Sequence, residues 1–246
     1  MRLLLISILY SAAAVLTPPA AAEVYTVYTA QGKNSTELQR HVRKLLPATA
    51  DNQPECQFVE LRKDCPDLQQ AEAQATAIAA GVTHLPCLVI ADTDGPYATL
   101  LLRGLTRKAV EQAVAQPNKE HQQAERQQRV FDAQLYLLFA RCAMEEATDE
   151  QLSELIQESR QLLSHELCTK ELQQLIGLRC LYPLLMKQYA IGHTGAHTPE
   201  TEAKLLEAIA ALEEARDINP NSTLGKRAHD ERHRLRMARR EARKYE

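Results

Sequence analysis

The hydrophobic pattern of this sequence changes from mixed strand and helix spacing to helix spacing alone near Pro117, and that change limits the architectures open to the chain. Before this point, short runs rich in β-branched and aromatic residues alternate with segments whose apolar residues recur at helical spacing. After it, helical spacing dominates. The pattern predicts an α/β domain over residues 23–116, followed by an all-α helical domain over residues 120–246.

Four segments of the first half are expected to be strands. They cover residues 24–29, 57–61, 87–91 and 98–102. Helical segments separate the first three strands, and another follows the capping residue Thr106. Short helical crossovers make the first two strands parallel, whereas a breaker-rich turn at residues 92–96 makes the last two antiparallel. The expected result is a four-stranded mixed sheet with flanking helices.

The order of these elements resembles the thioredoxin-like fold, and the resemblance covers residues 24–113. The segment Gly81-Val82-Thr83-His84-Leu85-Pro86-Cys87 is similar to the family segment in which a cis-proline precedes a central strand. Residues 94–104 are similar to the family's terminal hairpin and glycine. The resemblance implies a cis bond before Pro86.

The resemblance also indicates where a reactive site would lie, and the reactive residues are missing there. Redox-active relatives carry Cys-x-x-Cys after the first strand, where this chain has Lys33-Asn34-Ser35-Thr36. Thiol–disulfide exchange needs an attacking thiolate and a second, resolving thiol, and neither lysine nor threonine supplies one. We therefore expect no two-cysteine chemistry at this degenerate site. Its lining residues are Gln31, Gly32, Lys33, Thr36 and Pro86.

Cys87 is the remaining candidate for a catalytic residue. It follows Pro86, so the fold analogy places it beside the degenerate site. One interpretation is a lone reactive thiol whose pKa is lowered by Lys33. The other, which we favour, is a cysteine buried in its strand or bonded to Cys65, since cysteine is among the residue types most often buried.

Residues 1–22 have the form of a secretion signal. Arg2 precedes an apolar run at residues 3–16, and three alanines precede Glu23. The run is too short to cross a bilayer, and no later segment is apolar for long enough. The mature chain is therefore expected to be exported, to the periplasm or outside the cell, without a transmembrane segment.

An exported chain with six cysteines favours disulfide bonds. Cys56 and Cys65 flank one predicted strand and lie too far apart to bond to each other. The sequence does not choose among the remaining pairings. The candidate disulfide residues are Cys65, Cys87, Cys142, Cys168 and Cys180.

Capping patterns and apolar stripes divide the second half into helices. Thr148-x-x-Gln151 is a capping box that opens one helix, Thr198 caps another, and Pro183 is expected to kink or end the helix between them. One stripe resembles the second half of a tetratricopeptide repeat, without a second copy at that family's period. It consists of Ala208, Leu212, Ala215 and Pro220. A plain helical bundle is favoured over a repeat array.

The C-terminal segment, residues 226–246, is basic, with nine Lys or Arg against four acidic residues. We expect a solvated closing helix that balances an acidic neighbour, in preference to a contact with an anionic partner or a membrane surface. The whole chain has a net charge of −3, which gives no indication of nucleic-acid binding.

No metal or cofactor motif is recognisable. His193 and His197 are four residues apart but lie between Gly192 and Pro199, where a helix is not expected. We therefore predict an exported binding or scaffolding protein with a degenerate site, no cofactor, and another protein as partner. The alternatives are a divergent thiol-disulfide oxidoreductase or peroxidase that uses Cys87, and a redox-inactive chaperone for secreted clients.

Overall fold

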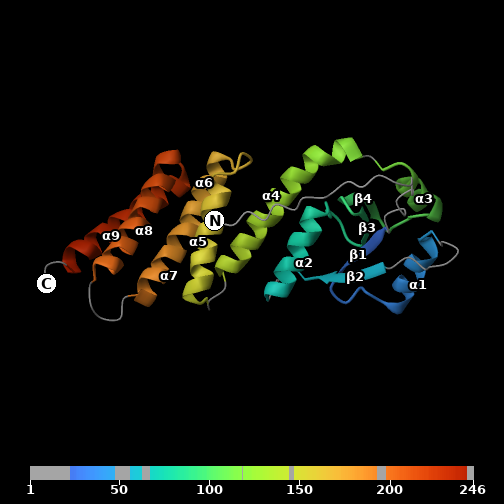
Figure 1. Cartoon of the computed structure of the whole chain (residues 1–246), viewed down its shortest axis with the longest axis horizontal. Helices are drawn as coiled ribbons and strands as arrows, with labels where there is room; N and C mark the ends of the chain where they lie inside the picture. The colour runs from blue at the N-terminus through green and yellow to red at the C-terminus, as the bar shows by residue number, and fades with distance from the viewer. Residues whose placement is uncertain are drawn as a thin grey trace, which may run out of the picture.

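The computed structural model describes residues 23–47, 56–62, 67–117, 119–143, 147–192 and 198–242. The predicted signal segment, Cys65, Pro66, His193 and His197 lie outside these ranges. The described chain is elongated, with a sheet and three helices at one end and a stack of helices at the other (Figure 1). The long helix α4 (Lys119–Ala143) runs from one end into the other.

The expected four-stranded mixed sheet is confirmed. Its strands are β1 (Val24–Ala30), β2 (Cys56–Leu61), β3 (Cys87–Asp92) and β4 (Gly95–Leu101). They lie in the order β2-β1-β3-β4, with β1 parallel to β2 and β3 antiparallel to both of its neighbours. This topology is compatible with a thioredoxin-like fold.

The hairpin between β3 and β4 is tighter than the expected turn over residues 92–96. Asp92 pairs with Gly95, so only two residues form the loop. The Asp94 N–H donates to the Asp92 carboxylate at 2.8 Å, and Gly95 adopts a φ of +112°. The side-chain hydrogen bond and the permissive glycine close the turn early, so β4 begins before the residues whose pattern is β-like.

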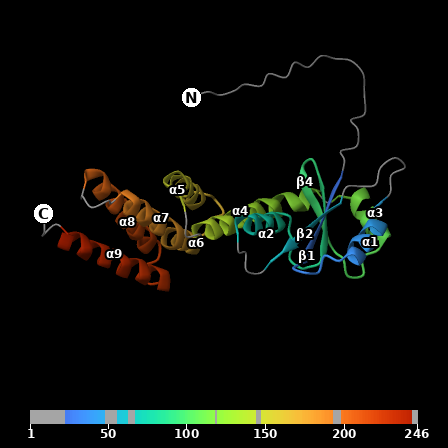
Figure 2. The ribbon, with the colours of Figure 1, turned by 90° about the horizontal axis from the view of Figure 1, so that it is seen from below.

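Helices cover both faces of the sheet. α1 (Thr36–Leu45) and α3 (Arg107–Ala115) pack on one face, against a buried cluster that includes Val27 and Ile90. α2 (Leu68–Ala79) packs on the other face, against a smaller cluster that includes Tyr28. Figure 2 shows the sheet edge-on between these two layers. Thr106 caps α3 as expected, Ser35 caps α1, and Asp67 caps α2.

Helix α4 lies along α2 and thereby connects the two ends of the molecule (Figures 1 and 2). Two glycines allow this close approach. The Arg129 side chain lies where a Cβ at Gly81 would be, and the Arg126 side chain lies where a Cβ at Gly95 would be. Gly81 also has a φ of +77°, a conformation that other residues rarely adopt.

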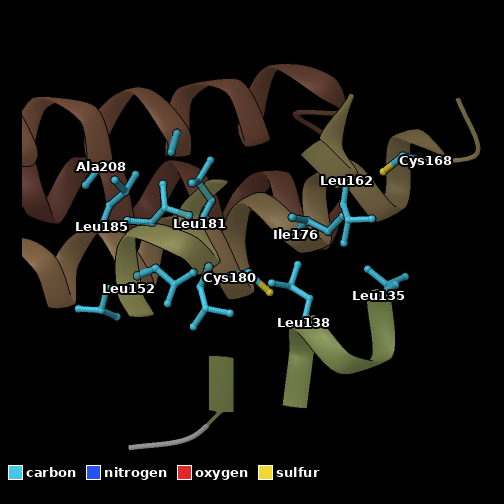
Figure 3. Packing of buried hydrophobic residues seen from close by; sticks show 14 of the residues in the cluster. Leu135, Leu138, Leu152, Leu162, Cys168, Ile176, Cys180, Leu181, Leu185 and Ala208 are labelled. Atoms are coloured by element: carbon cyan, nitrogen blue, oxygen red, sulfur yellow. The ribbon is translucent and has the colours of Figure 1, made fainter. Parts of the chain in front are cut away.

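The remaining elements build the helical end. They are α5 (Asp149–Leu163), α6 (Lys170–Ile176), the π-helical turn η1 (Gly177–Leu181), α7 (Tyr182–Gly192), α8 (Pro199–Ile218) and α9 (Thr223–Ala242). The predicted capping box of Thr148 and Gln151 is present, and Thr198 caps α8. A single apolar cluster joins α4 to α5, η1, α7 and α8 (Figure 3).

Pro183 does not end its helix, because the π-helical turn η1 precedes it. The Tyr182 N–H bonds the Gly177 carbonyl, one residue further back than in an α-helix. Proline removes one N–H donor and crowds the carbonyl of the preceding turn. The wider turn leaves room for the ring, so α6, η1 and α7 form one continuous helical run.

The basic closing helix α9 balances its neighbour α8, as expected from the sequence. Arg232 donates to the Glu213 carboxylate at 3.1 Å, and Arg236 contacts the same carboxylate. Arg239 pairs with Glu202. Much of the positive charge of α9 is thus directed at α8.

No helix among the described residues combines the length and the apolar character needed to cross a membrane.

Candidate functional site

The degenerate site lies at one end of the sheet, where β1 ends and β3 begins. Tyr28 of β1 pairs with Cys87 of β3, so the residues after Tyr28 and those before Cys87 lie at the same edge. The Gln31 N–H donates to the Leu61 carbonyl at 3.1 Å, which holds the turn after β1 against the end of β2. Lys33 follows in this turn, and its N–H donates to the Ala30 carbonyl at 3.0 Å.

The bond between Leu85 and Pro86 is cis, as the resemblance implied. Pro86 directly precedes β3, where its missing N–H removes no hydrogen bond between strands. Its carbonyl accepts a hydrogen bond from the Leu102 N–H at 3.1 Å. Leu85 and Pro86 are both exposed. The structure therefore brings the proline loop and the turn after β1 to one solvent-facing edge.

The segment Lys33-Asn34-Ser35-Thr36 leads into α1. The Ser35 hydroxyl accepts from the Leu38 N–H at 3.1 Å and caps the helix, and Thr36 is its first residue. The Asn34 side chain accepts from the Gln39 amide at 3.0 Å. The side chains of Lys33 and Thr36 are exposed. This edge presents an amine and a hydroxyl to solvent.

Gly32 is needed at this edge for its backbone alone. Its φ is +70°, and nothing lies within 4 Å of the place where a Cβ would be. A side chain would find space there but would force an L-residue into a left-handed conformation.

Cys87 has the surroundings of a core cysteine. Its side chain is fully buried among residues of the α2 face, such as Ala77 and Val89, whereas α1 packs on the opposite face. Burial raises the pKa of the Cys87 thiol to about 11, although a backbone hydrogen bond from Tyr28 opposes the shift. A thiol with so high a pKa is almost entirely protonated, and so weakly nucleophilic, near neutral pH.

The structure brings two other candidate cysteines together, Cys142 at the end of α4 and Cys180 in η1. Both are free thiols, and their side chains are close enough to affect each other's pKa. Cys180 belongs to the buried apolar cluster of the helical end, and Cys142 packs against it. Cys168, buried between α5 and α6, has no partner thiol among the described residues. The sequence indicates these residues as disulfide candidates but does not indicate their pairing. The available signal was that Cys142 and Cys180 each lie at helical spacing within an apolar stripe, after Leu138 and before Leu184 respectively.

Cys56 stands at the start of β2, opposite Tyr25. Since Cys87 is opposite Tyr28, the two cysteines are three strand residues apart along β1, and β1 lies between them. That separation is too great for a disulfide bond. Burial raises the pKa of the Cys56 thiol to about 11.

The helical end carries a groove that the sequence analysis did not anticipate. It lies between α5, the junction of η1 with α7, and α8, and it has a volume of about 440 Å³. Its apolar lining comes from Leu163, Leu181, Leu185, Ala210 and Ala211. The alanine-rich stretch of α8 was the available signal, because small side chains on a helix leave space beside it.

Charged residues stand at the rim of this groove. Arg160 of α5 forms an ion pair with Glu207 of α8 across it. Glu214, two helical turns further along α8, is exposed and has no cationic partner among the described residues. The rim therefore has excess negative charge near Glu214.

Metal binding finds no support in the described part of the chain. No three His, Cys, Asp or Glu side chains there are grouped as metal ligands. His193 and His197 lie outside the described residues, so their prediction is not tested.

Comparison with protein-family models, with curated proteins and with solved structures found no match to this chain. The likeness of the first half to a thioredoxin-like fold therefore depends on the strand order, the cis-proline and the residues around them. The tetratricopeptide-like stripe on α8 depends on its own four residues.

Proposed function

We propose that this chain is an exported binding or scaffolding protein, composed of a thioredoxin-like domain without its dithiol and a helical domain that holds a segment of another protein. One observation carries the proposal. At the edge where dithiol chemistry would occur, Lys33 and Thr36 are exposed in place of thiols, and Cys87 beside it is buried on the opposite face from α1. The sheet thus offers a surface and no accessible nucleophilic thiol among its described residues.

The groove of the helical end is the proposed binding surface. Its floor of leucine and alanine side chains is suited to an apolar side chain from a partner. Glu214 at its rim favours a partner that carries a lysine or arginine next to that apolar residue. The proposed occupant is therefore a short protein segment in which an apolar residue is followed by a basic one.

Helix α4 supports the scaffolding part of the proposal. It packs along α2 in the sheet half and contributes Phe131, Leu135 and Leu138 to the core of the helical half. A helix that is packed at both ends keeps two surfaces at a constant spacing. The degenerate site and the groove would then be presented together.

A library of short peptides of mixed sequence, immobilised and probed with the full mature chain, tests the groove. We expect selection of peptides with an apolar residue beside Lys or Arg. Ala210→Trp, which fills the groove from its exposed side, should abolish the selection, and Glu214→Lys should remove the preference for basic residues. Ala203→Trp on the exposed surface of the same helix is the matched control, since Ala203 does not line the groove.

Two results would contradict this assignment. One is selection that Ala210→Trp and Ala203→Trp reduce equally, because the groove would then have no special part in binding. The other is turnover of insulin disulfides by the wild-type chain that Cys87→Ser abolishes. That result would establish the alternative, a thiol oxidoreductase, and the binding proposal would fail.

A further inference from the structure

Cys142 and Cys180 approach each other from two different elements of the helical end. Cys142 lies in the last turn of α4, four residues after Leu138, and therefore on the same face of that helix. Cys180 lies in η1, and its side chain points toward the part of α4 that carries Leu138 (Figure 3). Both belong to the apolar cluster, in which Leu138 and Cys180 are fully buried.

Both residues are free thiols, and the Cys180 S–H is close enough to donate toward the Cys142 sulfur. This donation, helped by the nearby cations of Arg141 and Lys187, lowers the pKa of the Cys142 thiol, although burial and Glu158 oppose the shift. Cys142 is only partly buried, whereas Cys180 is fully buried. Cys142 thus has the properties of an attacking thiol, and Cys180 those of a resolving thiol.

The other described cysteines are placed differently. Cys168 belongs to the same cluster, but Figure 3 shows it at one edge, beyond Leu162, whereas Cys180 lies near the middle. Cys56 and Cys87 belong to the sheet half, on β2 and β3. Within the described residues, the contact between thiols is specific to one pair.

We propose that Cys142 and Cys180 form a disulfide bond that ties α4 covalently to the core of the helical half. This inference goes beyond the proposed binding function and does not depend on it. It makes the junction between the two halves of the molecule sensitive to the redox state of its surroundings. When the bond is reduced, α4 is held only by packing.

The reaction requires an oxidant, which we take to be a disulfide of a protein or a small molecule. The Cys142 thiolate attacks one sulfur of that disulfide, so that a mixed disulfide forms and one thiolate leaves. Cys180 then loses its proton and attacks the Cys142 sulfur, which expels the second thiolate of the oxidant. The two cysteines together lose two electrons and two protons, and the oxidant is reduced to two thiols.

Tryptic digestion of the chain separates the relevant cysteines and gives a direct test. Cleavage after Arg141, Arg160, Lys170, Arg179 and Lys187 places Cys142 in 142–160, Cys168 in 161–170 and Cys180 in 180–187. The mature chain is equilibrated with oxidised glutathione, blocked with N-ethylmaleimide, digested and analysed by mass spectrometry. We expect 142–160 joined to 180–187, and a loss of this species after reduction. Blocked peptides for both residues, or a bond from either to Cys168, would overturn the proposal.

Thermal unfolding gives a second, independent readout. The oxidised wild type should unfold several degrees above the reduced wild type, and Cys168→Ser should retain that difference. Cys142→Ser should lose it, and as Cys142 is partly exposed this variant keeps the buried Cys180 and the packing around it. A redox-dependent shift that survives in Cys142→Ser would refute the pairing even if the Cys180→Ala variant fails to fold.

These outcomes are distinguishable from those of the binding proposal. Peptide selection by the groove can be measured on oxidised and reduced protein. Loss of the joined tryptic peptides with selection intact refutes the disulfide alone. Joined peptides without selection refute the binding function alone.

Discussion

The reactivity of Cys87 can be predicted quantitatively, and it decides whether the sheet half retains thiol chemistry. Burial raises the pKa of this thiol from 9.0 to about 11. A shift of that size lowers the thiolate fraction at neutral pH by about a hundredfold relative to an ordinary thiol. Complete burial of the side chain restricts access further.

The measurement is the rate of alkylation of Cys87 by iodoacetamide as a function of pH, with the modified residue localised by fragmentation in a mass spectrometer. We expect slow modification at neutral pH and a rate that still rises above pH 10. The same chain in denaturant should titrate near the ordinary pKa of a thiol, about 8.5. The Lys33→Ala variant should leave the folded profile unchanged, because Cys87 faces α2 and Lys33 is exposed at the edge.

A folded-state profile that levels off near pH 7, and moves to higher pH in Lys33→Ala, would refute this reasoning. It would show that Lys33 activates Cys87. Lys44→Ala, which removes an exposed lysine from the last turn of α1, is the matched control for a general charge effect.

The same shift has a consequence for stability. Because folding raises the pKa of Cys87, the folded state binds the thiol proton more tightly than the unfolded state does. The tighter binding of this proton stabilises the folded state. This stabilisation is fully present below pH 9 and is lost as the pH rises through about 11.

Two substitutions test the packing of α4 at its two ends. Leu138→Ala removes a fully buried side chain from the helical core and should lower the free energy of unfolding by about 3 kcal/mol in urea titrations. Leu206→Ala, at an exposed position on α8, should lower it far less. Equal effects of the two substitutions would refute the assigned core. Gly81→Ala should destabilise the chain by about 1 kcal/mol or more, because the φ is +77° and the added Cβ meets Arg129. In an Arg129→Ala background the steric part of that cost should disappear, and an undiminished cost would leave backbone strain as the whole cause.

Local sequence signals were sufficient to predict the positions of most helices and strands and much of the strand pairing in the sheet. The strands at residues 24–30 and 87–92, and the helices capped by Ser35 and Thr148, are specified by residues close together in the chain. The parallel and antiparallel pairings followed from the lengths of the connections. The absence of a dithiol at Lys33 and Thr36 was also readable directly, because it concerns residue identity alone.

Features that depend on contacts between several helices could not be predicted from local sequence signals. Pro183 was expected to kink its helix or end it early, and the helix continues through it after the π-helical turn η1. The choice between these outcomes depends on how η1 packs against α5, α7 and α8, which no local pattern contains. The groove has the same origin, since it exists only where three helices meet at a particular separation.

The sequence by itself therefore determined the order of strands and helices, the degenerate site and the charge of the closing helix. Only the tertiary structure decided which face Cys87 occupies, that Cys142 lies near Cys180, and where the groove of the helical end is formed. The physical reason is the separation along the chain over which each kind of interaction acts. Caps, turns and periodicity act within a few residues, whereas a contact between residues 142 and 180 forms only after separate helices have buried their apolar faces together.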